Sequence, residues 1–242
     1  MLSTLWDASV MVERKPVGVR ARARAEITEQ IKRIAREHLA VEGPNLSLRA
    51  VARDLGVVSS AVYRYFSSRD ELLTALIIDA YDALGDAVDA ADAAVSRHNL
   101  HGRWMATGRA IRTWARANPH QYALLYGSPV PGYAAPQDTI GPASRPVFVL
   151  AAILGDGVAQ GVLAPKDRLP RLVRSDLTRL TKSAEFSALT PAVLARGMTV
   201  WAQLFGTLSF ELFGRLNNAV TEFDAYFDHQ LKVMAAYLGL SS

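Results

Sequence analysis

Residues 46–66 read LSLRAVARDLGVVSSAVYRYF, and this stretch decides the fold of the N-terminal part of the chain. Ser47 can cap the first of two short helices through its hydroxyl. Four apolar residues then share one face of that helix: Leu48, Val51, Ala52 and Leu55. Gly56 follows directly, where a helix needs a residue that tolerates positive φ in order to end. The pattern therefore predicts a short helix that ends in a tight turn.

A second short helix is expected to run from this turn to Phe66. Val62 and Phe66 are four residues apart, so both face the inward side of that helix. The outward side is left with mostly polar residues: Ser59, Ser60, Tyr63, Arg64 and Tyr65. Two short helices around a glycine turn, the second with a polar outer face, are typical of a helix-turn-helix, whose second helix enters the DNA major groove.

The region around this motif resembles the DNA-binding domain of the TetR family of one-component transcriptional regulators. The resemblance spans roughly residues 22 to 75 and rests on these residues: Ile27, Ile31, Ile34 and Ala35; Gly43; Leu48, Ala52, Leu55, Gly56 and Val57; Val62 to Phe66; and Arg69 to Leu73. It implies an all-α chain, with a three-helix helix-turn-helix domain followed by a larger helical bundle that binds a ligand and dimerises. Val58 and Ser59 depart from the family pattern, a Ser cap followed by Pro or a small residue, so the cap is expected at Ser59.

These patterns divide the chain into three parts. Residues 1–21 are expected to form a flexible basic arm, residues 22–68 the helix-turn-helix domain, and residues 69–242 the ligand-binding and dimerisation domain. Five basic residues precede or open the first helix: Arg14, Lys15, Arg20, Arg22 and Arg24. The arm is either a solvated tail or a segment that lies along phosphates or enters the minor groove, as homeodomain arms do.

Helical patterns continue to the C-terminus. Ser68 and Glu71 form a capping-box pattern that opens a helix reaching toward Ala94. Further helices are expected over residues 22–41, 100–117, 120–126, 145–160 and 165–184, followed by two long helices from Pro191 and from about Thr221. Residues 127–136 are expected to form a loop, because prolines lack an amide donor and restrict their predecessors.

Composition limits the classes of function. The chain has 242 residues, half of them apolar, and a formal net charge of +4. It has no cysteine, which excludes disulfides, thiolate metal sites and cysteine nucleophiles. No apolar run is expected to reach the ~20 residues that span a bilayer, and charged residues interrupt the N-terminal apolar positions. We therefore expect a cytoplasmic protein with no membrane partner, no cofactor and no bound metal.

Residue type assigns the candidate DNA contacts. Arg49 can reach a guanine edge with two hydrogen bonds, or a phosphate. Tyr63 and Tyr65 have hydroxyls that suit phosphate oxygens, and the resemblance implies that role for Tyr63. Small side chains at the leading end of the second helix suit bases or phosphates: Ser59, Ser60 and Ala61. The remaining candidates are Ser47, Arg64, Arg69, Arg20, Arg22 and Arg24. For Arg69, an ion pair with Asp70 or Glu71 is the alternative.

The expected C-terminal bundle contains candidates for an effector cavity and for a dimer interface. Aromatic residues that suit the walls of an apolar cavity are Trp104, Trp114, Tyr122, Tyr126, Phe148, Trp201 and Phe205, although each alone also suits core packing. The two C-terminal helices are apolar on more than one side and must be buried on more than one side. The surplus face is expected to pack on a second copy as a four-helix bundle, a purely internal hairpin being the alternative. The interface residues would be Val200, Leu204, Leu208, Phe223, Phe227 and Leu231.

Residues and resemblance together imply a DNA-binding transcriptional regulator. We expect a ligand-responsive repressor that binds a palindromic operator in double-stranded DNA as a homodimer and is released by a small apolar effector. No catalytic residue is expected, because His98 and His101 lack a third ligand at a telling spacing. The alternative is a small-molecule-binding or catalytic helical bundle with a vestigial helix-turn-helix.

Overall fold

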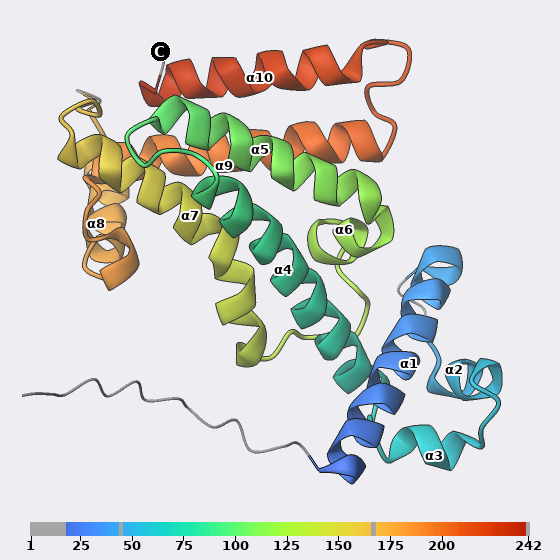
Figure 1. Ribbon diagram of the computed structural model, residues 1–242. Coiled ribbons are helices and arrows are strands. Elements are labelled where there is room, and N and C mark those ends of the chain that lie inside the picture. The colour runs from blue at the N-terminus through green and yellow to red at the C-terminus, as the bar shows by residue number, and fades with distance from the viewer. Residues whose placement is uncertain (1–17, 44–45, 166–167, 241–242) are drawn as a thin grey trace, which may run out of the picture.

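The structure, a computed structural model, describes residues 18–43, 46–165 and 168–240. This part of the chain is all-α, which confirms the expected fold class, with a small N-terminal head and a larger helical body (Figure 1). The helices are α1 (Val19–Glu42), α2 (Leu48–Asp54), α3 (Ser59–Tyr63), α4 (Arg69–Ala93), α5 (Leu100–Ala117), α6 (Pro119–Tyr126), α7 (Ile140–Ala159), α8 (Arg171–Leu180), α9 (Pro191–Leu212) and α10 (Phe223–Leu238), with 3₁₀ turns η1 (Gln137–Thr139) and η2 (Ala184–Phe186).

The head consists of α1, α2 and α3 around a core that the first turns of α4 complete. Ser47 caps α2 by accepting a hydrogen bond from the amide of Ala50, and Gly56 has a φ of 72° in the turn before α3. The buried side chains that meet there include Ile31, Leu39, Leu48, Val51, Val62, Phe66, Leu72 and Leu76. Because α2 and α3 bury only one side each, their opposite sides are free for a partner.

Three boundaries in the head differ from expectation. α1 begins at Val19, three residues before the expected start at Arg22, so Arg20 lies on the same helix as Arg22 and Arg24 instead of in an arm. Most of the expected arm, residues 1–17, lies outside the described residues. α3 ends at Tyr63 instead of Phe66, and the last residues of the motif form turns. Val58 holds the cap position of α3 without a side-chain bond, so Ser59 is its first helical residue and not its cap.

α4 connects the head to the body, as expected. The Ser68 hydroxyl accepts a hydrogen bond from the Glu71 amide at 3.1 Å, which is half of the predicted capping box. The Glu71 carboxylate bonds the amide and hydroxyl of Ser67 at 2.6 and 2.7 Å. Beyond the head, α4 packs chiefly against α5 and α7. A displacement of α4 therefore moves the head relative to the body.

The body encloses a second core between α4, α5, α7, α9 and α10, and α7 has the most apolar sequence of these helices.

Residues 137–159 are long and apolar enough to cross a membrane by length and composition alone, a run that we did not expect from the sequence. Here they pack as part of the bundle, since Arg145 bonds Asp86 and Asp89 of α4 at 2.7 and 2.6 Å. α7 begins at Ile140, five residues before the expected start.

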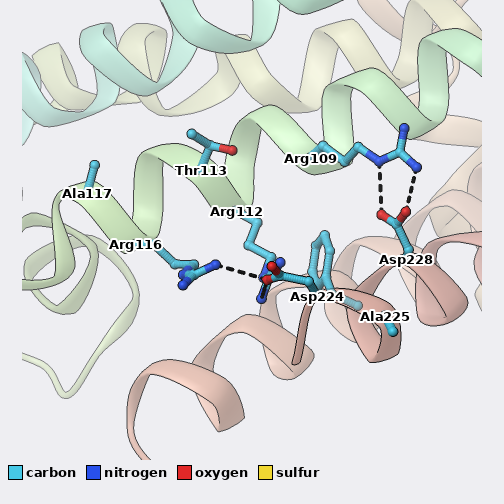
Figure 2. Close-up of a pocket in the computed structure, with 9 residues that line it drawn as sticks. Arg109, Arg112, Thr113, Arg116, Ala117, Asp224, Ala225 and Asp228 are labelled. Carbon is cyan, nitrogen blue, oxygen red and sulfur yellow. Dashed lines mark hydrogen bonds and ion pairs between the residues drawn. The ribbon is translucent and has the colours of Figure 1, made fainter. Parts of the chain in front are cut away.

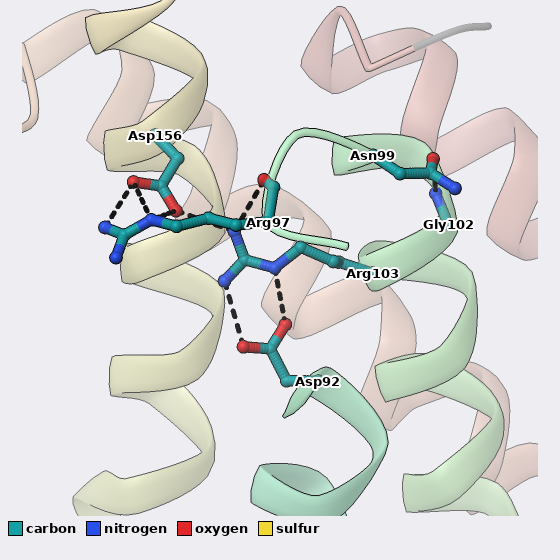
Figure 3. A network of polar contacts seen from close by, with 6 residues as sticks. All are labelled: Asp92, Arg97, Asn99, Gly102, Arg103 and Asp156. Carbon is teal, nitrogen blue, oxygen red and sulfur yellow. Dashed lines mark hydrogen bonds and ion pairs between the residues drawn. The ribbon is translucent and has the colours of Figure 1, made fainter. Parts of the chain in front are cut away.

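A buried ion-pair network fixes the end of α4 against α5 and α7 (Figure 3). Arg103 of α5 is buried and bonds Asp92 of α4 through two nitrogens at 2.8 and 2.9 Å. Its third contact, at 2.6 Å, is Asp156 of α7, which Arg97 also binds. Burial raises the pKa of Asp156, but the hydrogen bonds from Arg97 and Arg103 outweigh that effect and lower it. The carboxylate therefore stays charged in the fold.

Candidate nucleic-acid interface and ligand sites

The polar side of α3 faces outward, as a reading helix requires. Val62 and Phe66 are buried in the head core, whereas Ser60, Tyr63 and Arg64 are exposed. The other candidates on this segment, Ser59, Ala61 and Tyr65, are half-buried. Side chains at the leading end of α3 are thus available to a duplex, while the apolar side anchors the helix.

A surface groove of about 550 Å³ brings several candidate residues together beside α3. Ser47, Arg49, Tyr63 and Arg69, from three helices and a cap, all line it. Ser67 and Ser68 also line the groove and were not among the expected contacts, although the capping pattern at Ser68 is a signal that marks a helix start there. Hydroxyls, two guanidinium groups and the N-terminus of α4 suit a phosphate group.

Arg24 of α1 contacts Arg64 and Tyr65, the two residues that follow α3. Its guanidinium lies 4.9 Å from the centre of the Tyr65 ring, and it donates a hydrogen bond of 3.4 Å to the carbonyl oxygen of Arg64. The side chain was expected in or beside a mobile arm, but it contacts the protein instead. Arg20 and Arg22 lie on the same helix with exposed side chains.

A second contact, which sequence reasoning missed, fixes α2 to α1. His38 is buried, and its Nε2 lies 2.7 Å from a carboxylate oxygen of Asp54 at the end of α2. The hydrogen bond with His38 lowers the pKa of Asp54. The two residues are sixteen positions apart, and no local pattern pairs them.

Three of the seven expected cavity aromatics belong to the core instead. The indole of Trp104 donates to the carbonyl oxygen of Leu231 at 2.8 Å, and the hydroxyl of Tyr122 donates to that of Phe205 at 3.0 Å. Trp114 is also buried. In the structure these three rings fill closed space between helices, and the polar atoms of Trp104 and Tyr122 bond the backbone of neighbouring helices.

Two adjacent cavities open into the body, and two of the expected aromatics line them. Cavity A, about 430 Å³, is lined by Val147, Leu150, Ala151, Leu154, Leu180, Phe186, Leu189, Leu194, Gly197, Met198, Trp201 and Ala202. Cavity B, about 710 Å³, lies under the loop of residues 127–136 and is lined by residues that include Ile77, Tyr81, Leu125, Val130, Tyr133, Phe148 and Phe186. Phe186 and Val147 line both, so the two cavities share part of their walls.

The remaining two expected aromatics lie behind these walls. Phe205 packs at a tilt against Trp201 of cavity A with ring centres 4.4 Å apart, and Tyr126 packs in the same way against Phe205 at 4.2 Å. Tyr126 also meets the edge of Tyr81, a wall of cavity B, at 6.2 Å. The Tyr126 hydroxyl is buried with no hydrogen-bond partner in the described part of the chain, and burial raises its pKa, so it stays protonated.

A third hollow, between α5 and α10, is a clamp and not a ligand site (Figure 2). Arg109 binds Asp228 with two nitrogens at 2.9 and 2.6 Å. Arg112 binds both oxygens of Glu211 and also Asp224 at 2.8 Å, and Arg116 binds Asp224 at 3.0 Å. Each of the three arginines is therefore paired with a carboxylate of a neighbouring helix.

Most of the expected dimer residues are buried within one copy of the chain. Val200, Leu204, Leu208, Phe227 and Leu231 have at most 1% of their surface exposed, and Phe223 is half-buried. The first five therefore cannot contact a second copy, and that expectation is wrong. The outward face of α9 and α10 instead carries Met198, Ala202, Gly206, Phe210, Phe213, Val233 and Tyr237, all exposed.

Metal chemistry finds no support in the part of the chain that the structure describes, where no group of three or more His, Asp or Glu side chains is placed to hold an ion. Of the two histidines considered, His101 lies 3.0 Å through Nδ1 from the carbonyl oxygen of Leu240.

Comparison with known proteins shows what the whole chain is similar to. Residues 33–76 match the family model "Bacterial regulatory proteins, tetR family", and residues 104–234 match "Tetracyclin repressor-like, C-terminal domain". HTH-type transcriptional regulator Rv1816 of Mycobacterium tuberculosis (strain ATCC 25618 / H37Rv) is 41% identical over 226 residues, which are 92% of this chain and 96% of that protein. Regulator Mb1846 of Mycobacterium bovis gives the same values. The crystal structure of the regulatory protein SCO4313 is similar with a TM-score of 0.74 and 32% identity, covering 90% of this chain and all of that one (100%).

Proposed function

Because this chain belongs to the TetR family of transcriptional regulators, and is therefore a DNA-binding regulator and not an enzyme, we propose that it is a ligand-responsive repressor. It binds a palindromic operator as a homodimer and leaves that operator when a small apolar effector enters the body. DNA is its first partner, which places the protein in the cytoplasm. The observation that carries the proposal is a reading helix anchored by Val62 and exposed at Tyr63, above a body with apolar cavities.

DNA recognition follows from the head. Tyr63, Arg49 and Arg69 contact phosphates around the groove beside α3, which sets the position of the helix. Ser60 of α3 and Arg64, the residue that follows α3, are exposed and then reach base edges in the major groove. The test is fluorescence anisotropy with a duplex from upstream of the gene, competed with a random duplex of equal length. Equal affinity for both would leave a nonspecific DNA-coating protein, and turnover of a metabolite without DNA binding would favour the rival helical enzyme.

Dimerisation uses the outward face of α9 and α10. Met198, Ala202, Gly206 and Phe210 recur every four residues along α9, so they form one stripe. Its two small residues allow a second helix to approach closely, and the exposed Met198 and Phe210 side chains supply apolar area. Two copies joined there present two reading helices to two half-sites about one DNA turn apart.

The loop of residues 127–136 supports release by an effector. Val130 and Tyr133 line cavity B and also pack against the head core. The Tyr133 hydroxyl lies 2.9 Å from that of Thr74 on α4. An effector that binds one arrangement of this loop more tightly than the other shifts the equilibrium between two positions of the head, and its difference in affinity sets the size of that shift. A coupling free energy of about 1.4 kcal/mol lowers operator affinity tenfold.

A further inference from the structure

The walls of cavity A are apolar throughout. The described residues that line it are all aliphatic or aromatic, apart from a glycine, and none is charged. Its volume of about 430 Å³ lies within the usual range for small-ligand pockets, about 300–1,000 Å³. A charged ligand would lose its hydration here without gaining a partner. The cavity therefore suits an uncharged ligand with an apolar or aromatic body, which can stack against Trp201.

The mouth of cavity A is made of apolar side chains that are exposed in a single copy. Met198 is 52% exposed and Leu180 is 43% exposed, and Ala202 beside them is also exposed. Leu172 and Val173 of α8 add further exposed apolar surface, since Leu177 is the only buried residue in that helix. Exposed apolar surface around an apolar hollow is typical of a region that a partner covers.

The mouth is continuous with the dimer face described above. Met198 and Ala202 belong both to the lining of cavity A and to the outward stripe of α9 that continues through Gly206 to Phe210. A second copy that covers this stripe cannot avoid covering the rim of the cavity. Because the rim of cavity A lies on this stripe, the copy that covers the stripe also closes the cavity.

We propose that cavity A is completed by a second copy of this chain, so that an uncharged apolar ligand binds the dimer tightly and the single copy weakly. The proposal deepens the function proposed above and rests on its homodimer. By linkage, a ligand that needs the dimer strengthens dimerisation by the same factor by which dimerisation strengthens ligand binding. Effector concentration and protein concentration then act on the same equilibrium.

Three variants test the proposal with Nile red, an uncharged apolar dye, by fluorescence titration alongside sedimentation equilibrium. Phe210→Glu puts a charge on the dimer stripe without touching cavity A, because Phe210 is 54% exposed and does not line the cavity. Ala151→Phe fills the cavity from its inner wall and leaves the stripe unchanged. Val41→Glu, at an exposed apolar position in the head, is the matched control for the added charge.

We expect the unchanged protein and Val41→Glu to be dimers that bind the dye saturably. Phe210→Glu should be a monomer with at least tenfold weaker dye binding, and Ala151→Phe a dimer with the same loss. A monomeric Phe210→Glu protein that binds the dye as tightly as the dimer would overturn the shared cavity and leave the homodimer standing. A dimeric Phe210→Glu protein, or an unchanged protein that is monomeric, would instead overturn the proposed dimer face. Undiminished dye binding by Ala151→Phe would remove cavity A as the site. Circular dichroism confirms that each variant is folded.

Discussion

At the scale of single residues, Tyr63 joins the fold to its proposed use. It lies at the last position of α3, one residue after the buried Val62, so the same helical turn anchors the head and presents the phenol ring outward. Arg49 and Arg69 line the same groove, where phosphate oxygens would accept hydrogen bonds from these side chains.

The first prediction is that Tyr63→Phe weakens operator binding by about a hundredfold, because the proposed dimer loses the contact from both heads, and leaves the fold intact. A hydrogen bond to a charged group contributes about 1.5–3 kcal/mol, whereas an exposed hydroxyl contributes little to folding. Anisotropy gives the affinity and thermal unfolding gives the stability. Tyr237→Phe is the matched control, because Tyr237 is 45% exposed on α10 and Tyr63 is 44% exposed. Equal operator affinity of the two variants would remove Tyr63 from the interface.

At the scale of helices, two ion pairs that differ in burial hold α5 in the bundle: Arg112–Glu211 joins it to α9, and Arg109–Asp228 joins it to α10. Arg112 and Glu211 each have 10% of their side-chain surface exposed, whereas Arg109 and Asp228 have 53% and 37%. Losing one partner of a buried pair leaves a buried charge, but losing an exposed one restores hydration. The two pairs, on successive turns of α5, therefore have very different effects on stability.

The second prediction concerns this difference. Arg112→Leu should lower the free energy of unfolding by about 3 kcal/mol, at the low end for a buried pair because Arg116 remains 3.9 Å from Glu211. Arg109→Leu should lower it by at most about 1 kcal/mol. Urea unfolding of both variants measures the two values side by side. Similar losses in the two would show that burial does not govern this clamp.

The third prediction is that the protein loses stability in acid, partly because the ion pairs of Asp224 and Asp228 with arginines of α5 are lost when these carboxylates become protonated. The hydrogen bond from Arg112 lowers the pKa of Asp224, and that from Arg109 lowers the pKa of Asp228. A carboxyl group with a lowered pKa in the fold stabilises the protein above its unfolded pKa, about 3.9, and that contribution is lost as the pH falls through the folded pKa. The melting temperature should therefore change little above about pH 5 and fall steadily below about pH 4. Replacing both aspartates with asparagine should flatten that decline; an unchanged decline would assign it to other carboxylates.

Helices also show what sequence could and could not predict. The head follows from signals a few residues apart, such as the Ser47 cap, the positive φ of Gly56 and the spacing of Val62 and Phe66. On α9 and α10 the apolar pattern predicts burial on more than one side, but periodicity does not say which neighbour covers each side. Val200 and Leu231 were therefore assigned to a second copy, although their own copy buries them completely.

Contacts between distant parts of the chain were also beyond sequence reasoning. The Arg103 network joins residues 11 and 53 positions away, and no spacing rule pairs them before the helices are arranged. The same holds for the two cavities, because Trp104 and Trp201 have the same residue type, yet one fills the core and the other lines cavity A. Residue type indicates an aromatic wall only where the packing of helices leaves a space.

At the scale of the whole molecule, the proposed dimer brings two heads to one duplex, so every phosphate contact would be made twice. If each head neutralises three or four phosphates, about 6–8 are neutralised in total, and affinity should fall roughly 10³- to 10⁴-fold between 50 and 200 mM salt. A single head would lose far less. The steepness of the salt dependence therefore reports how many copies bind.

The fourth prediction uses that steepness to count copies. Arg49→Ala should reduce the slope of log affinity against log salt by about two, because a phosphate contact is lost from each head and each contributes about 0.9. Arg179→Ala, which removes an exposed arginine from α8 in the body, should leave the slope unchanged. Phe210→Glu, if monomeric, should bind with about half the original slope. A slope that falls by about one for Arg49→Ala would mean that only one head contacts the operator, and an unaltered slope would mean that Arg49 contacts a base and not a phosphate.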